Sequence, residues 1–223
     1  MIGDSLIKHL ERTSRFSVES CKNMGVLNAA MAGDKLENIL YRIENMKFPD
    51  KVKKVYLAGG TNNLFSHTTE EIIDTLGRCV TVLKNKNPEL EVYVQGLIAR
   101  FFVGEDTVKK IEQINEQLRE KFGQYFVDVR RVVGGEGGET QRKFFYRDGL
   151  HLSRRGNERL ADIVEKIVGR QVSTTKNRTG NTWWIDFQDY DMCVNASIQG
   201  RPVRVLIDTG SCITLISKKL YKK

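Results

Sequence analysis

Five residues in four short stretches of the sequence have the types and spacing that acyl transfer requires. A hydrolase of this kind needs a hydroxyl nucleophile, an imidazole that takes its proton, a carboxylate that fixes the imidazole tautomer, and donors that stabilise the oxyanion. Ser5 supplies the hydroxyl and His151 the imidazole, and Asp148 can reach the outer ring nitrogen on a tight turn. The N–H groups of Ser5 and Gly33 and the side-chain amide of Asn62 are the expected oxyanion donors. These residues predict a hydrolase that forms an acyl-enzyme and uses neither a cofactor nor a metal ion.

Alternating strands and helices are expected to position these residues. Apolar residues at helical spacing predict four amphipathic helices, over residues 36–43, 72–83, 108–118 and 160–167. Thr68 and Glu71 form a predicted capping box before the second helix. Runs rich in β-branched and aromatic residues alternate with the helices and predict strands, namely GVLNA, KVYLAG, LEVYVQGL and YFVDV. The pattern indicates an α/β fold, a parallel sheet with helices on both faces, in which ligands bind beyond the carboxyl ends of the strands.

The composition excludes several classes of protein. The 223 residues are 40% hydrophobic and 29% charged, which is ordinary for a globular protein. No apolar run reaches the roughly 18 residues of a membrane helix, and no signal peptide is recognisable, so we expect a cytosolic protein without a transmembrane segment. The 4 cysteines lack metal-ligand or disulfide spacing. The net charge of +8 allows weak contact with nucleic acid, but the basic residues are dispersed, which favours a solvated surface. His9 and His67 lack a suitably spaced carboxylate and are expected on the surface.

The four stretches together resemble the SGNH, or GDSL-type, esterase and lipase family. Its blocks correspond to GDSL at Ser5, NAAMAGD with Gly33, GGTNN with Asn62, and DGLHLSRRG with Asp148 and His151. One tetrapeptide arises by chance, but four blocks in the family's order over residues 2–168 are specific. The resemblance implies a flavodoxin-like sheet, a triad, an oxyanion hole and an acyl-ester substrate.

Each of these residues also has an ordinary structural interpretation. Ser5 could cap a helix that begins directly after it, and His151 could be a plain N-terminal helix residue. Gly33 and Asn62 are both residue types that turns prefer.

The resemblance is incomplete at the beginning of the sequence. In the SGNH fold an interior strand precedes the GDSL block, whereas only Met1 and Ile2 remain of it here. Loss of an interior strand leaves its neighbours with unpaired backbone groups. We therefore interpret the sequence as a fragment whose first strand is missing, and we expect the intact parent to be the competent esterase.

The character of the sequence changes after the last predicted helix. Residues 1–169 form the predicted SGNH-like domain, residues 170–182 a polar linker, and residues 183–223 a β-rich module. In this module VRVLIDTGSCITLIS, with VNASIQGRPV before it, resembles the truncated start of a small all-β retropepsin-like aspartic protease domain. That resemblance makes Asp208 one of two carboxylates that activate water, with the second from another copy in a homodimer, and implies a polypeptide substrate.

An SGNH-like domain joined to a retropepsin-like start resembles a piece of a retroelement polyprotein. The first hypothesis is a serine esterase. The second is an aspartic endopeptidase that uses Asp208 to process the parent polyprotein, although the sequence stops soon after this residue and one truncated half-site is not expected to cut peptides. The third is a degenerate or fragmentary chain without catalytic activity whose SGNH-like domain binds RNA or a membrane-associated partner.

Overall fold

The chain divides into two compact units, Met1–Trp184 and Ile185–Lys223. The computed structural model describes residues 1–49, 51–135, 139–169, 193–198 and 201–206. All five predicted esterase residues belong to the first unit and are described.

In the described part of the first unit, three short parallel strands form a sheet, in the order β1 (Lys54–Leu57), β2 (Glu91–Gln95) and β3 (Phe126–Val127). β1 and β2 pair with Val55 opposite Val92, and β2 and β3 pair with Val94 opposite Phe126. One long helix follows β1 and another follows β2, which are the crossovers that parallel pairing requires. The prediction of a parallel α/β sheet is confirmed for these three strands.

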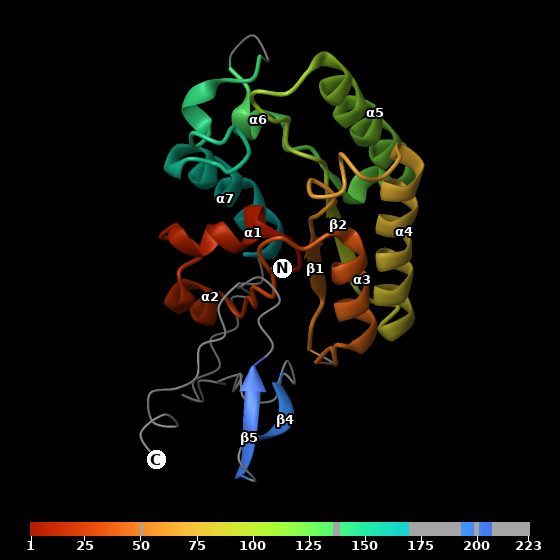
Figure 1. Cartoon of the computed structure of the whole chain (residues 1–223), viewed down its shortest axis with the longest axis vertical. Helices are drawn as coiled ribbons and strands as arrows, with labels where there is room; N and C mark the ends of the chain where they lie inside the picture. Colours follow the sequence, from red (N-terminus) through yellow and green to blue (C-terminus); the bar gives the residue numbers. More distant parts are fainter. Residues whose placement is uncertain (50, 136–138, 170–192, 199–200, 207–223) are drawn as a thin grey trace, which may run out of the picture. The chain divides into compact units, whose positions relative to one another are not determined.

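Helices cover both faces of this sheet (Figure 1). One face is covered by α3 (Leu36–Asn45), α4 (Thr69–Lys86) and α5 (Glu105–Phe122). The opposite core cluster contains residues of α1 (Ser5–Lys8), α2 (Val18–Met24), α6 (Arg130–Val133) and α7 (Arg154–Val168). Short 3₁₀ turns lie at η1 (His9–Arg12), η2 (Gly123–Tyr125) and η3 (Arg142–Phe144). None of the described helices is long and apolar enough to cross a membrane.

Alternate residues of β1 divide the core into two layers. Val55 and Leu57 are buried with α3 and α4, whereas Tyr56 is buried in the opposite cluster. This alternation follows from the two-residue period of a strand. The four predicted helices are present as α3, α4, α5 and α7, and the capping box of Thr68 and Glu71 begins α4 as predicted. Among the described helices of seven or more residues in this unit, α2 alone was not predicted; it has 7 residues.

Residues 1–3 occupy an interior position beside β1. Ile2 N donates a backbone hydrogen bond of 2.8 Å to Tyr56 O in β1, and Ile2 O accepts one of 3.0 Å from Ala58 N, just after β1. On the opposite side, the carbonyls of Met1 and Gly3 accept backbone hydrogen bonds of 2.8 and 2.9 Å from the segment 29–31. The prediction of a strand at GVLNA is wrong, because this segment is irregular and finds only three residues to pair with.

The second unit contains an antiparallel hairpin of β4 (Cys193–Ile198) and β5 (Arg201–Leu206). Cys193 pairs with Leu206 at one end of the hairpin, and Ile198 pairs with Arg201 at the other. This hairpin coincides with the stretch that was predicted to precede the aspartic protease motif. Asp208 and the predicted linker lie outside the described residues.

Candidate active site

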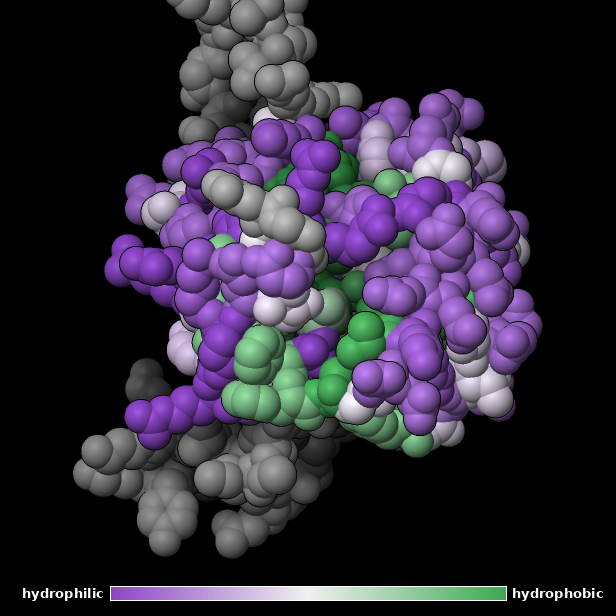
Figure 2. Space-filling view, turned by 90° about the horizontal axis from the view of Figure 1, so that it is seen from above, coloured by the Kyte–Doolittle hydropathy of each residue, from purple (hydrophilic) through white to green (hydrophobic). Residues whose placement is uncertain are grey.

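The predicted esterase residues meet at the carboxyl edge of the sheet. Ser5 follows residues 1–3, Asn62 follows β1, and the turn of Asp148 and His151 precedes α7. Figure 2 shows this side of the molecule, where the surface is hollowed and apolar residues gather within the hollow. Such an edge is where sheets of this class bind their ligands.

Ser5 is held at the start of α1 by its neighbours. The Asp4 carboxyl group accepts a hydrogen bond of 2.9 Å from Leu6 N, so Asp4 rather than Ser5 caps this helix. Asp4 and Ser5 are 2% and 5% exposed. Gly3 permits this close packing, because a Cβ there would lie 2.7 Å from Ala58 O. The Ser5 hydroxyl is therefore held in place by buried residues.

His151 and Asp148 form a local pair on an exposed turn. Asp148 Oδ1 accepts hydrogen bonds of 2.9 Å from the backbone N–H groups of Leu150 and His151. His151 Nδ1 donates to Asp148 Oδ2 at 2.7 Å. Gly149 adopts a left-handed conformation with φ 67° in this turn, and its carbonyl accepts a hydrogen bond of 2.8 Å from Phe101 N. Hydrogen bonds within residues 148–151 thus fix most of the geometry of the pair. Helix α7 begins only after these residues.

One chain of hydrogen bonds joins this pair to the nucleophile. Ser5 Oγ lies 3.0 Å from His151 Nε2, across 146 positions of sequence. Burial opposes the charge of Asp148, but the hydrogen bonds from the His151 ring and from the backbone outweigh it and lower the pKa of Asp148 to about 2. An ionised Asp148 accepts a hydrogen bond from the protonated Nδ1 of His151, which leaves Nε2 unprotonated and able to accept the Ser5 hydroxyl proton.

The three predicted oxyanion donors have unused N–H groups. Within the described part of the chain, no hydrogen bond engages the backbone N–H of Ser5 or of Gly33. Asn62 Nδ2 donates one proton to Asp34 O at 2.9 Å, and its second proton has no such partner. Gly33 has φ +83°, a left-handed conformation that favours glycine. The space around its Cβ position is open, so this conformation and not close packing is the reason for a glycine here.

A buried ion pair connects the segments that carry these donors. Arg42 Nη2 and Nε lie 2.5 and 2.9 Å from Asp34 Oδ2. The Arg42 side chain is 10% exposed and that of Asp34 is 4% exposed. The same guanidinium donates to the carbonyls of Ala29 at 2.6 Å and Gly3 at 3.4 Å. Arg42 therefore ties the segment before the oxyanion glycine to the segment before the nucleophile, a role that residue spacing did not reveal.

His9 packs against the ring of His151. The two ring centroids are 5.0 Å apart, and the ring planes are inclined by 40°. His9 Nδ1 is buried and has no hydrogen-bond partner within the described residues. Burial lowers the pKa of His9 to about 4, and Arg12 and His151 act in the same direction. The prediction that His9 is a surface residue is wrong, because the tertiary fold brings η1 against the turn before α7.

The same prediction is also wrong for His67. Its ring is only 23% exposed and pairs with the Glu37 carboxylate at the start of α3. This partner is 30 residues away in the sequence, so local spacing could not identify it.

No metal site adds to this constellation in the part of the chain that the structure describes. Asp208 lies outside the described residues. Among the residues that the structure describes, no group of three or more His, Cys, Asp or Glu side chains is arranged to hold a metal ion.

Comparisons with known proteins agree with the fold and with the predicted family. Residues 1–159 match the model of the GDSL-like lipase/acylhydrolase family. The alpha1 subunit of platelet-activating factor acetylhydrolase IB from Rattus norvegicus is 30% identical over 174 residues, which cover 76% of this chain and 74% of the relative. The corresponding subunit from Homo sapiens is 29% identical over the same shares of the two chains.

Solved structures share the fold at low sequence identity. A GDSL-like lipase from Bacteroides thetaiotaomicron superposes with a TM-score of 0.60 at 16% identity, over 75% of this chain and 85% of that chain. The OSK domain of Drosophila Oskar superposes with a TM-score of 0.61 at 14% identity, over 76% of this chain and 87% of that chain.

Proposed function

Because the chain belongs to the GDSL-like lipase/acylhydrolase family, we propose that Ser5, His151 and Asp148 form the catalytic triad of a serine esterase. The protein is a hydrolase of the esterase type. The continuous hydrogen-bond chain from Asp148 through His151 to Ser5 is the observation that carries the proposal for the triad.

The reaction would proceed through an acyl-enzyme. Ser5 Oγ attacks the ester carbonyl carbon while His151 Nε2 takes the hydroxyl proton, and the carbonyl electron pair moves onto oxygen. When the intermediate collapses, the leaving alkoxide takes that proton from Nε2. A water molecule then attacks the acyl-enzyme, gives its proton to Nε2, and releases the acid, after which Ser5 recovers its proton. One ester and one water become one acid and one alcohol.

The unused N–H groups would stabilise the charge that develops on oxygen. Ser5 N, Gly33 N and Asn62 Nδ2 are held by a buried helix start and by the Arg42 network, so they need little reorganisation during the reaction. Asp148 would keep the His151 ring in one tautomer throughout.

A short acyl group is the substrate feature we propose. The curated relatives are named as acetylhydrolases, so an acetyl ester is the first substrate to test.

The test is covalent labelling with a fluorophosphonate together with turnover of 4-nitrophenyl acetate. We expect the full chain to be labelled, and we expect Ser5→Ala to abolish labelling and lower kcat by at least about 10³-fold. Ser14→Ala, which changes an exposed serine of the same region, is the matched control and should behave as wild type. Equal labelling of wild type and Ser5→Ala, or no labelling and no turnover in the wild type, would contradict the proposal.

We further propose that the second unit belongs to a retropepsin-like module of a retroelement polyprotein. The antiparallel hairpin of β4 and β5 directly precedes the Asp208 motif, which supports this assignment. Peptide cleavage that a pepstatin-like compound blocks and Asp208→Asn abolishes would establish an aspartic endopeptidase. Ester hydrolysis at Ser5 should be insensitive to both changes, so the two activities can be separated.

A further inference from the structure

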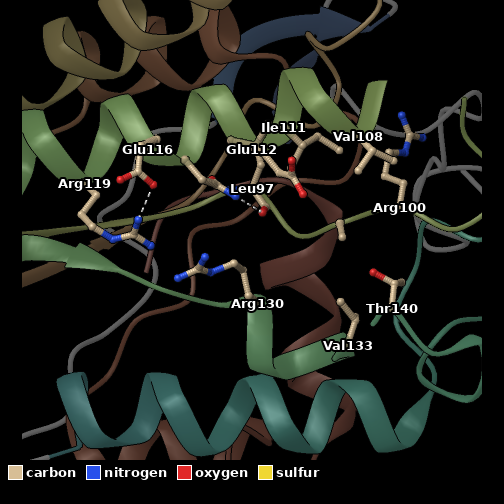
Figure 3. A pocket seen from close by; sticks show the side chains of 12 residues that line it. Leu97, Arg100, Val108, Ile111, Glu112, Glu116, Arg119, Arg130, Val133 and Thr140 are labelled. Carbon is tan, nitrogen blue, oxygen red and sulfur yellow. Dashed lines mark hydrogen bonds and ion pairs between the residues drawn. The ribbon is translucent and has the colours of Figure 1, made fainter. Parts of the chain in front are cut away.

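A cavity of about 340 Å³ lies beyond β2 and β3, between α5 and the segment of α6 (Figure 3). Leu97, Ile111 and Val133 are buried and give it apolar walls. This volume can hold a small organic group. None of the triad or oxyanion residues lines the cavity.

Two of the three arginines that line the cavity already have carboxylate partners. Arg119 donates to Glu116 at 2.6 Å and to Asp128 at 3.1 Å. Arg130 Nη2 donates to Asp128 at 2.5 Å. Their charges are therefore largely compensated within the protein.

Arg100 differs from these two arginines. It is only partly exposed, and within the described residues its guanidinium has no hydrogen bond and no ion pair. Glu112 also lines the cavity but does not pair with it (Figure 3). The guanidinium lies 5.0 Å from the Phe65 ring centroid. Burial lowers the pKa of Arg100, and the charge of Asp148 opposes that shift only in part. A partly desolvated cation that has no carboxylate partner is stabilised strongly when a ligand places an anion beside it.

Arg100 also stands between two segments of the candidate active site. Phe65 belongs to the segment that carries Asn62, and the neighbouring Phe101 N donates to Gly149 O, in the turn of the acid and the base. The electrostatic effect of Asp148 on Arg100 agrees with this position. The same side chain therefore borders both the cavity and the catalytic edge.

We propose that the cavity is a subsite for an anionic group of the ester substrate, a carboxylate or a phosphate, which Arg100 binds while the ester lies at Ser5. This inference rests on the proposed esterase function. The apolar walls would contact the carbon skeleton that joins the anion to the ester. Arg100 is a specificity residue in this arrangement, and the bond-breaking chemistry stays with the triad.

The test compares acetyl esters that differ in charge. Methyl 4-acetoxybenzoate is neutral, 4-acetoxybenzoate carries a carboxylate, and 4-acetoxyphenyl phosphate carries a phosphate. We expect Arg100→Gln to lower the ratio of kcat/KM for at least one anionic ester to kcat/KM for the neutral ester by about tenfold. Arg100→Lys keeps the charge but not the planar fork and should retain part of the preference. Arg78→Gln, which removes an exposed arginine of α4, is the matched control for net charge and should leave the ratio unchanged.

Inhibitor binding tests the subsite independently of this variant, and covalent labelling tests the esterase. If Arg100→Gln fails to fold, the wild type is tested with inhibitors instead. Two of them are anions, 4-hydroxybenzoate and 4-hydroxyphenyl phosphate, and the third is the neutral methyl 4-hydroxybenzoate. At least one anion should bind better than the neutral compound by about tenfold. An unchanged kcat/KM ratio in Arg100→Gln, or equal inhibition by the anionic and neutral compounds, would overturn the subsite. Fluorophosphonate labelling of Ser5 reports separately on the esterase, so either result with intact labelling removes only the subsite.

Discussion

The nucleophile and its acid–base partner are supported in opposite ways. Ser5 and Asp4 are buried, and their segment depends on hydrogen bonds to β1, to residues 29–31 and to Arg42. The side chains of Asp148 and His151 are 48% and 29% exposed, and hydrogen bonds within their own turn fix them. One half of the candidate site therefore depends on the global fold and the other on a local turn. Mutations of the residues that support Ser5 should act mainly through stability, whereas mutations in the turn of Asp148 and His151 should act mainly through catalysis.

The largest expected effect is a catalytic loss in the exposed turn. Asp148→Asn should lower kcat for 4-nitrophenyl acetate by about 10³- to 10⁴-fold, because an amide no longer fixes the tautomer that accepts the Ser5 proton. Glu105→Gln, a neutralisation at a side chain that is 92% exposed, is the control and should leave kcat unchanged. A loss of less than tenfold in Asp148→Asn would argue against the triad.

The next effect is a stability loss in the buried half. Arg42→Met leaves the Asp34 carboxylate buried without its partner, so the free energy of unfolding in urea should fall by about 3–5 kcal/mol. Arg15→Met is the comparison, because Arg15 contacts acidic residues of α7 at the surface and its loss should cost less than about 1 kcal/mol. Similar losses in the two variants would show that the buried pair does not anchor the segment.

A pH-dependent effect should distinguish Asp4 from Asp148. Burial raises the pKa of Asp4 from 3.8 to about 6, so its contribution to stability is full below pH 3.8 and is lost as the pH rises through about 6. This loss is on the order of 3 kcal/mol. Asp4→Asn keeps a capping side chain that does not ionise, and its stability relative to wild type should rise between pH 4 and 7 in urea unfolding.

The sign is reversed for Asp148. Its lowered pKa contributes stability above pH 3.8, and that contribution is lost as the pH falls through about 2. If stability relative to wild type follows the same pH curve for Asp4→Asn and Asp148→Asn, the contrast between the two halves is wrong.

The smallest effect concerns His9, which lies where the two halves meet. His9→Ala should lower kcat by about threefold to tenfold because the His151 ring loses its aromatic contact, and His9→Phe should restore most of that loss. The lowered pKa of His9 contributes stability above pH 6.5, which is lost as the pH falls through about 4. His9→Phe should remove this part of the acid-dependent destabilisation. Equal kcat values for the Ala and Phe variants would mean that the ring contact does not position His151.

The same contrast explains what the sequence could predict. Asp148 and His151 are three residues apart, so their pairing follows from a local turn, and the family blocks supplied the long-range partner Ser5. The helices were predictable from their apolar periodicity. Arg42 and His9 were not, because a buried ion pair and a ring contact between distant segments leave no periodic signal. GVLNA was predicted as a strand from residue preference, but strand formation also needs a partner of sufficient length.

The separation of 146 positions between Ser5 and His151 has a consequence for the newly made chain. Synthesis proceeds from the N-terminus, so the nucleophile leaves the ribosome long before the base that would activate it. Until residue 151 has been made, Ser5 lacks the imidazole that would activate it and remains an ordinary hydroxyl. Because α7 follows the base directly and packs into the core with α1, reactivity and completion of the domain should arise together. An unfinished chain would thus carry the serine without its reactivity.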